Sequence, residues 1–369
     1  MKFTCDKREL ESAMRTAMRA VPSKSTMPIL ECVLIEADEK GITVTANSMD
    51  MGLVTHIDGT VHEFGQAAIE AKVLNEISGK LPSGDATIGI ENDIAKIKAG
   101  RSKFEIPCRD ADSFIRLPEV EAGVSVMVDQ EQFRNAIQKS IFCISQNDKV
   151  PTMTGEKIEV NGNVMRFIAL DGHRIAITEI MLDKDYGKAE SIVPGRTLSE
   201  LTKILKEGHL EIEFTQSHCI FDVDGTTLIS RVIEGQYFDV SKMMRFEHST
   251  ALKVDACELL SCIGRASVVM RDGDKRPVVM EIFDGGLSID ASTQMGHVHE
   301  ELAAEKTGED LRIGFNDRFL GDAIGAASSY DDEIELQFES QKSPVAITRA
   351  DAPYRYIVLP VNLPPKETT

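Results

Sequence analysis

A unit of about 124 residues occurs three times along the chain, and this repeat constrains the fold more than any other feature of the sequence. Each copy opens with a short apolar strand, an aspartate and an amphipathic helical pattern. The chain has 369 residues, and a third of that length is close to the observed period. The period is too long for a solenoid, so it predicts three tandem domains of similar build. We place them at residues 1–121, 122–247 and 248–369.

Helix starts recur at the same place in every copy. An aspartate precedes each opening helix, and a Glu or Gln follows it three residues later, in the pairs Asp6 and Glu9, Asp129 and Gln132, and Asp255 and Glu258. This spacing is typical of a capping box, in which the aspartate accepts from a helical amide and the later side chain reaches back. We therefore expect an aspartate-capped helix at the start of each domain.

A second helix and an alternating strand follow later in each copy. Helical patterns cover residues 73–81, 198–205 and 319–324, and strands with a period of two cover 86–90, 210–214 and 334–338. Turn signals such as Asp224-Gly225 indicate hairpins between short strands. The pattern predicts an α+β fold in which each domain has two helices packed on antiparallel sheets.

The chain is acidic, with 41 Lys and Arg against 60 Asp and Glu for a net charge of −19. Such a charge repels nucleic acid from most of the surface. No apolar run approaches the roughly 20 residues of a membrane span, and the first ten residues, MKFTCDKREL, have no apolar signal core. The seven cysteines are odd in number and never spaced CxxC, which argues against disulfides and zinc sites. We expect a protein of the reducing cytoplasm with no membrane partner.

The sparse basic residues gather on the exposed faces of the predicted helices. On each helix they lie on the face opposite the apolar residues. They are Arg8, Arg15, Arg19, Arg196, Lys203 and Arg318. One interpretation is that these faces are simply solvated. The other is that the repeated helices line one common surface that meets phosphates, because Lys and Arg neutralise phosphates without reading base sequence.

No catalytic motif is complete in the sequence. It contains no P-loop, no GxGxxG, no GxSxG and no HExxH. His297 and His299 could share a strand face, but a metal site would need further ligands. Asp171 and His173 could act as an acid–base pair in a hydrolase or lyase, but without a nucleophile or a convergent set of carboxylates we favour a polar turn between two strands. A repeat scaffold that binds only proteins is a third interpretation.

Five segments carry a resemblance to a known family. They are Met27-Pro-Ile-Leu30, Leu170-Asp-Gly-His-Arg-Ile175, Gly235-Gln-Tyr-Phe-Asp239, Phe315-Asn316 and the C-terminal Tyr356-Ile-Val-Leu-Pro-Val-Asn-Leu363. In this combination, and over essentially the whole chain, the sequence resembles the bacterial sliding clamp, the beta subunit of DNA polymerase III.

The resemblance implies three tandem DNA-clamp domains and a closed ring formed by a head-to-tail homodimer around double-stranded DNA. It implies a non-enzymatic processivity factor that needs no cofactor and no metal. Its expected partners are DNA bound without sequence preference, the replicative DNA polymerase and the clamp-loader complex.

The resemblance also assigns roles to residues of this chain. The peptide-binding pocket for these partners is expected to comprise Met153, Leu170, Gly172, His173, Arg174, Ile175, Lys242, Met243, Asn316, Phe319, Val358, Leu359, Pro360, Val361 and Leu363. Residues expected to contact DNA are Arg8, Arg15, Arg19, Lys24, Gln146, Lys149, Arg196 and Lys203. The dimer seam is expected to join Phe104 to Val268 and Val269.

The chain departs from the family pattern near the expected pocket. Phe238, Val240, Arg245 and Asn362 replace residues that are usual in the family, and Pro364–Thr369 extend past its usual end. These departures are expected to change which peptide the pocket prefers.

Overall fold

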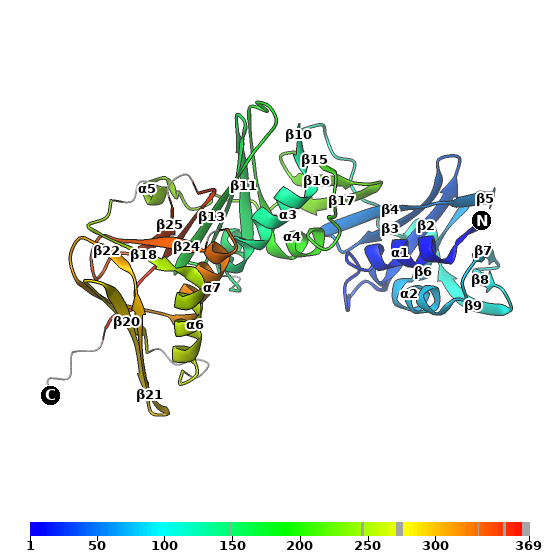
Figure 1. Cartoon of the computed structure of the whole chain (residues 1–369). Coiled ribbons are helices and arrows are strands. Elements are labelled where there is room, and N and C mark those ends of the chain that lie inside the picture. The colour runs from blue at the N-terminus through cyan, green and yellow to red at the C-terminus, as the bar shows by residue number, and fades with distance from the viewer. Residues whose placement is uncertain (148, 245–246, 271–275, 331, 350–351, 364–369) are drawn as a thin grey trace. The chain divides into compact units, whose positions relative to one another are not determined.

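The computed structural model describes the chain except for residues 148, 245–246, 271–275, 331, 350–351 and 364–369, and except for the side chains at 242 and 244 (Figure 1). Contacts within the chain divide it into two compact units. The first unit comprises Met1–Glu131 and Arg196–Val232, and the second comprises Gln132–Gly195 and Ile233–Thr369.

One antiparallel sheet of thirteen strands organises the first unit, in the order β10-β15-β16-β17-β4-β3-β2-β6-β9-β8-β7-β1-β5. The strands are β1 (Lys2–Asp6), β2 (Cys32–Asp38), β3 (Gly41–Asn47), β4 (Met51–Ile57), β5 (Gly59–Glu63), β6 (Gly65–Glu70), β7 (Asp85–Glu91), β8 (Ile94–Ala99), β9 (Ser102–Arg109), β10 (Val124–Asp129), β15 (His209–Phe214), β16 (His218–Val223) and β17 (Thr226–Arg231). Its helices are α1 (Lys7–Ala17), α2 (Ala71–Lys80) and α4 (Gly195–Leu201).

The second unit has one antiparallel sheet of nine strands and another of four, in the orders β14-β11-β12-β13-β26-β25-β24-β18-β22 and β21-β20-β19-β23. The strands are β11 (Gly155–Asn161), β12 (Val164–Leu170), β13 (Arg174–Met181), β14 (Lys188–Pro194), β18 (Thr250–Asp255), β19 (Val278–Phe283), β20 (Gly286–Thr293), β21 (Gly296–Ala303), β22 (Glu305–Thr307), β23 (Leu311–Phe315), β24 (Glu333–Phe338), β25 (Val345–Thr348) and β26 (Tyr354–Val358). Its helices are α3 (Gln130–Gln138), α5 (Ser241–Met244), α6 (Ala256–Ser267) and α7 (Asp317–Ser328).

Aspartate caps start two of the three opening helices, as the sequence predicts. The Asp6 carboxylate accepts from the Arg8 amide and begins α1, and the Asp255 carboxylate accepts from the Glu258 amide and begins α6. The α1 residues Leu10, Ala13, Met14 and Ala17 are buried. The 3.6-residue period therefore turns one face of each helix toward its sheet.

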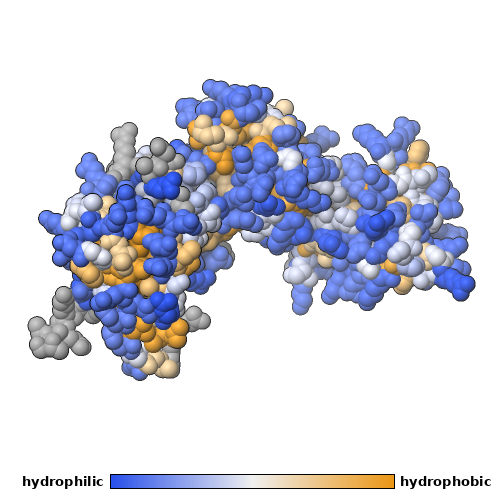
Figure 2. Space-filling model, in the orientation of Figure 1, coloured by the Kyte–Doolittle hydropathy of each residue, from blue (hydrophilic) through white to orange (hydrophobic). Residues whose placement is uncertain are grey.

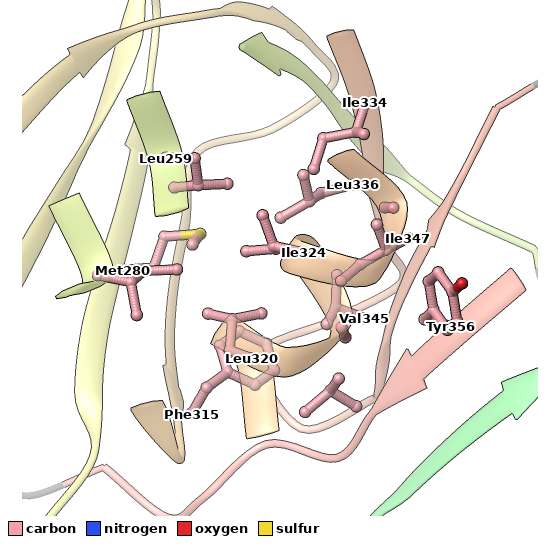
Figure 3. Close-up of a cluster of buried hydrophobic side chains, with 14 of the residues drawn as sticks. Leu259, Met280, Phe315, Leu320, Ile324, Ile334, Leu336, Val345, Ile347 and Tyr356 are labelled. Carbon is pink, nitrogen blue, oxygen red and sulfur yellow. The ribbon is translucent and has the colours of Figure 1, made fainter. Parts of the chain in front are cut away.

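Helices α6 and α7 and the strands around them enclose the core of the second unit (Figure 3). Leu320 and Ile324 of α7 are fully buried, together with Leu336 of β24 and Ile347 of β25. Each buried aliphatic side chain contributes about 1.5–3 kcal/mol. α7 is longer than the predicted 319–324 at both ends. It begins earlier because the Asn316 side chain accepts from the Phe319 amide and caps the helix.

The sheets continue across neighbouring repeats. β4 of the first repeat pairs with β17 of the second, and β13 of the second pairs with β26 of the third. These pairings place strands of the middle repeat in both compact units. The domain bounds that we predict from the repeat remain a prediction.

All seven cysteines, each of them in the described part of the chain, are free thiols, and only Cys257 is exposed. No helix among the described residues is both long enough and apolar enough to cross a bilayer.

Candidate functional sites

An open cavity of about 670 Å³ in the first unit gathers basic side chains from the ends of three helices. The cations that line it are Arg15, Arg19, Lys24, Lys72 and Arg196. Three carboxylates, those of Glu31, Glu70 and Glu200, also line it. Four of the eight predicted DNA contacts therefore share one surface, with an excess of positive charge over negative.

Ion pairs hold several of these cations in place. Arg19 binds Glu200 at 3.0 Å, and Lys203 binds the same carboxylate at 2.7 Å. Burial alone raises the pKa of Glu200, but hydrogen bonds from Lys203 and Arg19 outweigh it and lower the pKa below its usual value. Arg15 binds Glu11 at 2.8 Å. The pairs made by the exposed Arg15 and Lys203 stabilise the fold little, because solvent screens them.

Lys72 was not among the residues predicted from the sequence. It is the second residue of α2, as Arg196 is of α4 and Arg318 is of α7. The repeat therefore places a basic residue at the same point of each second helix. Comparing the three copies position by position would have identified Lys72.

The remaining predicted DNA contacts lie outside the cavity lining. Arg8 is exposed near the start of α1 and forms an ion pair with Asp6 at 3.3 Å. Lys203 is exposed and reaches the cavity through its pairing with Glu200. Gln146 and Lys149 are exposed residues of the second unit.

A tight turn joins β12 to β13 at Asp171–His173. Gly172 has a φ of 88°, which favours glycine. The Asp171 carboxylate accepts from the His173 amide at 2.9 Å and from the Arg174 amide at 3.1 Å. This run is therefore a turn, as the sequence favours.

Arg174 is an internal brace of this turn and is only 6% exposed. Its Nε binds Asp171 at 3.1 Å, and one terminal nitrogen binds Asp322 of α7 at 2.5 Å. The other terminal nitrogen donates to the Phe142 carbonyl at 2.7 Å. The guanidinium lies 4.5 Å from the ring centroid of Phe319. Its donors are thus directed at the protein itself.

His173 is exposed and stacks on Phe319, with ring centroids 5.8 Å apart and an interplanar angle of 20°. Asp171 directs its carboxylate to backbone amides and Arg174, so it does not orient the His173 ring as an acid–base partner would. Within the described residues no group of three or more His, Cys, Asp or Glu side chains could hold a metal ion.

Apolar side chains surround the same end of the sheet. Leu170 and Ile175 are buried in a cluster with Tyr237 and Ile357, and Met153 and Met243 pack on it half-buried. Four of the predicted pocket residues therefore share one apolar cluster, namely Met153, Leu170, Ile175 and Met243. The side chain of Lys242 lies outside the described part of the structure.

The C-terminal segment runs past this turn. The Leu359 amide donates to the His173 carbonyl at 2.9 Å, and the Val361 amide donates to the Gly314 carbonyl at 2.8 Å. Leu363 lies so close to Gly314 that an added Cβ there would come within 2.7 Å of its methyl group. Val358 is buried, Leu359 is 37% exposed, and Pro360 is half-buried. Leu359 therefore lies against the 171–173 turn, while Val361 and Leu363 lie against Gly314.

The family departures have different settings. Tyr237 is buried and donates to the Ile168 carbonyl at 2.9 Å, and Val240 is buried in the same cluster. Phe238, between them, points outward and is 50% exposed. Asn362 is exposed, while Arg245 and Pro364–Thr369 lie outside the described residues.

The predicted seam residues lie on exposed parts of both units. Phe104 is half-buried in β9, whose residues 102–107 pair with β8 and, among the described strands, with no other. Val268 is 81% exposed at the end of α6. Val269 contacts Gly296, and its carbonyl accepts from Thr293 at 2.8 Å. Met295 is also exposed, and apolar surface gathers at this end of the β20–β21 hairpin (Figure 2).

Three family models match the chain in succession. The N-terminal domain of the DNA polymerase III beta subunit matches residues 1–118, its central domain 127–239 and its C-terminal domain 243–362. A candidate DNA polymerase III beta subunit of Eubacterium rectale, solved as a crystal structure, is 36% identical and covers 98% of this chain and 99% of its own, with a TM-score of 0.95. This chain belongs to the DNA polymerase III beta subunit family.

Other members of the family agree over the full length. The crystal structure of the DNA polymerase sliding clamp of Bacillus subtilis is 27% identical, covers 99% of this chain and 100% of its own, and has a TM-score of 0.94. The beta sliding clamp sequence of Bacillus subtilis is 28% identical and covers 98% of this chain and 100% of its own. The predicted fold of three clamp domains with antiparallel sheets is confirmed.

Membership in the clamp family decides between the interpretations that the sequence left open. A beta clamp is an accessory processivity factor in DNA replication rather than a catalytic enzyme, and so is this chain. A hydrolase or lyase at Asp171 and His173 is not supported, in agreement with the turn geometry at these residues.

Proposed function

We propose that two copies of this clamp close head to tail into a ring around duplex DNA and hold the replicative polymerase on it. The observation that carries the proposal is the cationic cavity on a chain of net charge −19. The cavity of this acidic protein attracts phosphate, whereas the rest of the surface repels it. The cations responsible are Arg15, Arg19, Lys72 and Arg196.

The ring requires two identical heterologous seams. We propose that Phe104 of one copy meets Val268 and Val269 of the other. The exposure of Val268, the neighbouring apolar surface and residues 102–107 of β9, which among the described strands pair with β8 alone, support this placement. Contacts between two unlike surfaces form a closed ring when the rotation that relates one copy to the next adds up to a full turn. Two such seams make a closed dimer.

We propose that the surface around the 171–173 turn and the Val358–Leu363 segment binds short peptides of the polymerase and of the clamp loader. Met153, Met243 and Leu359 supply accessible apolar contacts beside the exposed His173. Flexible Met and aliphatic side chains adapt to different peptides. Arg174 holds the turn in place, since its nitrogens are bonded within the protein.

Because the proposed partners of the clamp act on chromosomal DNA, we place the protein in the cytoplasm.

The phosphate contacts can be tested by salt dependence. Replacing Arg15, Arg19 and Arg196 together with alanine should weaken binding to duplex DNA equally for every base sequence. The slope of log K against log salt should fall by about 0.9 per lost contact, because each phosphate contact releases a counterion. The measurement is a fluorescence-anisotropy titration over a range of salt concentrations.

A matched control changes the charge by the same amount elsewhere on the first unit. Lys40, Arg116 and Arg231 do not line the cavity, so their triple alanine variant should keep the wild-type slope. An unchanged slope in the cavity variant, or equal losses in both variants, would place the DNA contacts elsewhere.

A further inference from the structure

The outer face of the β20–β21 hairpin carries two histidines and two carboxylates. His297, His299 and Glu301 alternate along β21 and therefore share one face. Asp290 of β20 is paired in register with His299. The alternate side chains of β21 point to the opposite face of the sheet, and on that face Glu300 binds Arg265 of α6 at 2.6 Å. The histidines and their two carboxylates thus form one exposed group, the hairpin cluster.

Short contacts join the members of the hairpin cluster. His299 Nδ1 lies 2.8 Å from Asp290 Oδ1, and His299 Nε2 lies 3.4 Å from Glu301 Oε1. His297 Nε2 lies 3.7 Å from the same Asp290 oxygen. The hydrogen bonds to Asp290 and then to Glu301 raise the pKa of His299 above its usual value. Arg276 also lies nearby and donates to the Ser292 carbonyl opposite His297 at 3.2 Å. On the same face of the sheet, Arg312 binds Glu281 at 2.8 Å.

The hairpin cluster adjoins the proposed ring seam. β21 is the outermost strand of its sheet and, among the described strands, pairs with β20 alone. At its start Gly296 contacts Val269, one of the proposed seam residues. The hairpin cluster therefore lies on the strand that continues from the seam.

The opposite side of the seam has the complementary charge. On β8 and β9 the exposed side chains beside Phe104 include Lys98 and Lys103, which are paired in register, and Arg101 lies in the turn between these strands. The neighbouring register pair is Lys96 with Glu105, and Lys96 also binds Glu91. This face is basic, whereas the hairpin cluster is acidic as long as its histidines are neutral.

We propose that protonation of His299 weakens the ring seam, so that the clamp dimer dissociates more readily as the pH falls below neutrality. The proposal rests on the proposed dimer. In the separate chain the imidazolium is stabilised by Asp290 and Glu301, whereas in the ring it faces the partner's lysines as well. Closing the seam then releases a proton, and by linkage the proton opposes closure.

Sedimentation velocity on the full chain at pH 8 and pH 6 tests this, with three single variants beside the wild type. The wild-type dissociation constant should rise about tenfold at pH 6, as expected for loss of about 1.4 kcal/mol of attraction. His299→Gln should remove most of this rise. His299→Lys, which carries the charge at any pH, should weaken the dimer about tenfold at pH 8. His218→Gln, on β16 in the first unit, is the control and should respond as the wild type does.

An equal pH response in wild type and His299→Gln overturns the proposal, and so does a His299→Lys variant that dimerises normally at pH 8. A wild-type chain that is monomeric at pH 8 is a different result, because it contradicts the dimer on which the proposal rests.

Discussion

A chain that ends at Val358 should bind a polymerase-derived clamp-binding peptide at least about thirtyfold more weakly than the full chain, because it lacks one side of the proposed peptide site. The lost segment contains the accessible Leu359 and the Val361 amide that bonds to Gly314. Apolar anchors of small interfaces often contribute about 2 kcal/mol or more each. Isothermal titration calorimetry measures the change.

The end point of the truncation matters for the fold. Ile357 and Val358 are fully buried and Val358 pairs with Arg174 across β13 and β26, so a chain that stops at Tyr356 would lose core as well as site. A chain that ends at Leu363 is the matched control and should keep full affinity. Leu359→Ala leaves the strand intact and should reproduce part of the loss. Equal peptide affinity of the chains that end at Val358 and at Leu363 would remove this segment from the site.

Replacing Glu156 with glutamine should raise stability at alkaline pH by several kcal/mol. Glu156 is fully buried on β11, where it accepts from Ser140, and its other oxygen has no partner among the described residues. Burial raises the pKa of this carboxyl to about 8. The charged form is therefore disfavoured in the folded chain.

The sign of the pH dependence follows from that pKa. The unfolded carboxyl titrates near 4.5, so Glu156 costs nothing below that pH and destabilises the fold increasingly as the pH rises toward about 8. The full cost is on the order of 5 kcal/mol, at about 1.4 kcal/mol for each pKa unit. Urea midpoints of wild type and Glu156→Gln should agree at pH 4 and diverge by pH 9.

Glu159 on the same strand provides a control of opposite sign. Burial raises its pKa, but hydrogen bonds from Lys157 and Arg166 outweigh this and lower the pKa below its usual value. Its ionised form is therefore stabilising, and Glu159→Gln should lower stability at neutral pH and lose that effect in acid. A Glu156→Gln midpoint difference that is constant from pH 4 to pH 9 would contradict a buried, neutral carboxyl.

The repeated elements could be predicted because their determinants are local. Asp6 and Asp255 cap helices within a few residues of themselves, and the alternating patterns at 86–90, 210–214 and 334–338 lie within β7, β15 and β24. The turn at Gly172 follows from glycine and aspartate chemistry alone. In each case the residues that determine the structure lie within a few positions of one another in the sequence.

Long-range partners could not be predicted in the same way. The alternation of apolar and polar residues in β4 and β13 does not indicate which strand each one pairs with. β4 pairs with β17 and β13 pairs with β26, but any strand edge offers the same backbone hydrogen-bonding groups. Arg174 stays a predicted pocket residue, but its sequence surroundings do not indicate that its guanidinium binds Asp322, which is far along the chain. The burial of Glu156 depends on packing around it and has no local signature.

Topological retention on DNA tests the central claim most directly. The full chain is loaded by its clamp loader and ATP onto nicked circular duplex, isolated by gel filtration, and divided into samples with and without a cut that linearises the circle. The account predicts that the clamp stays on the circle and leaves the linear DNA. Val269→Glu, which places a charge in the proposed seam, should not be retained on either. Equal retention on circular and linear DNA, or full retention of Val269→Glu, would contradict a closed ring with this seam.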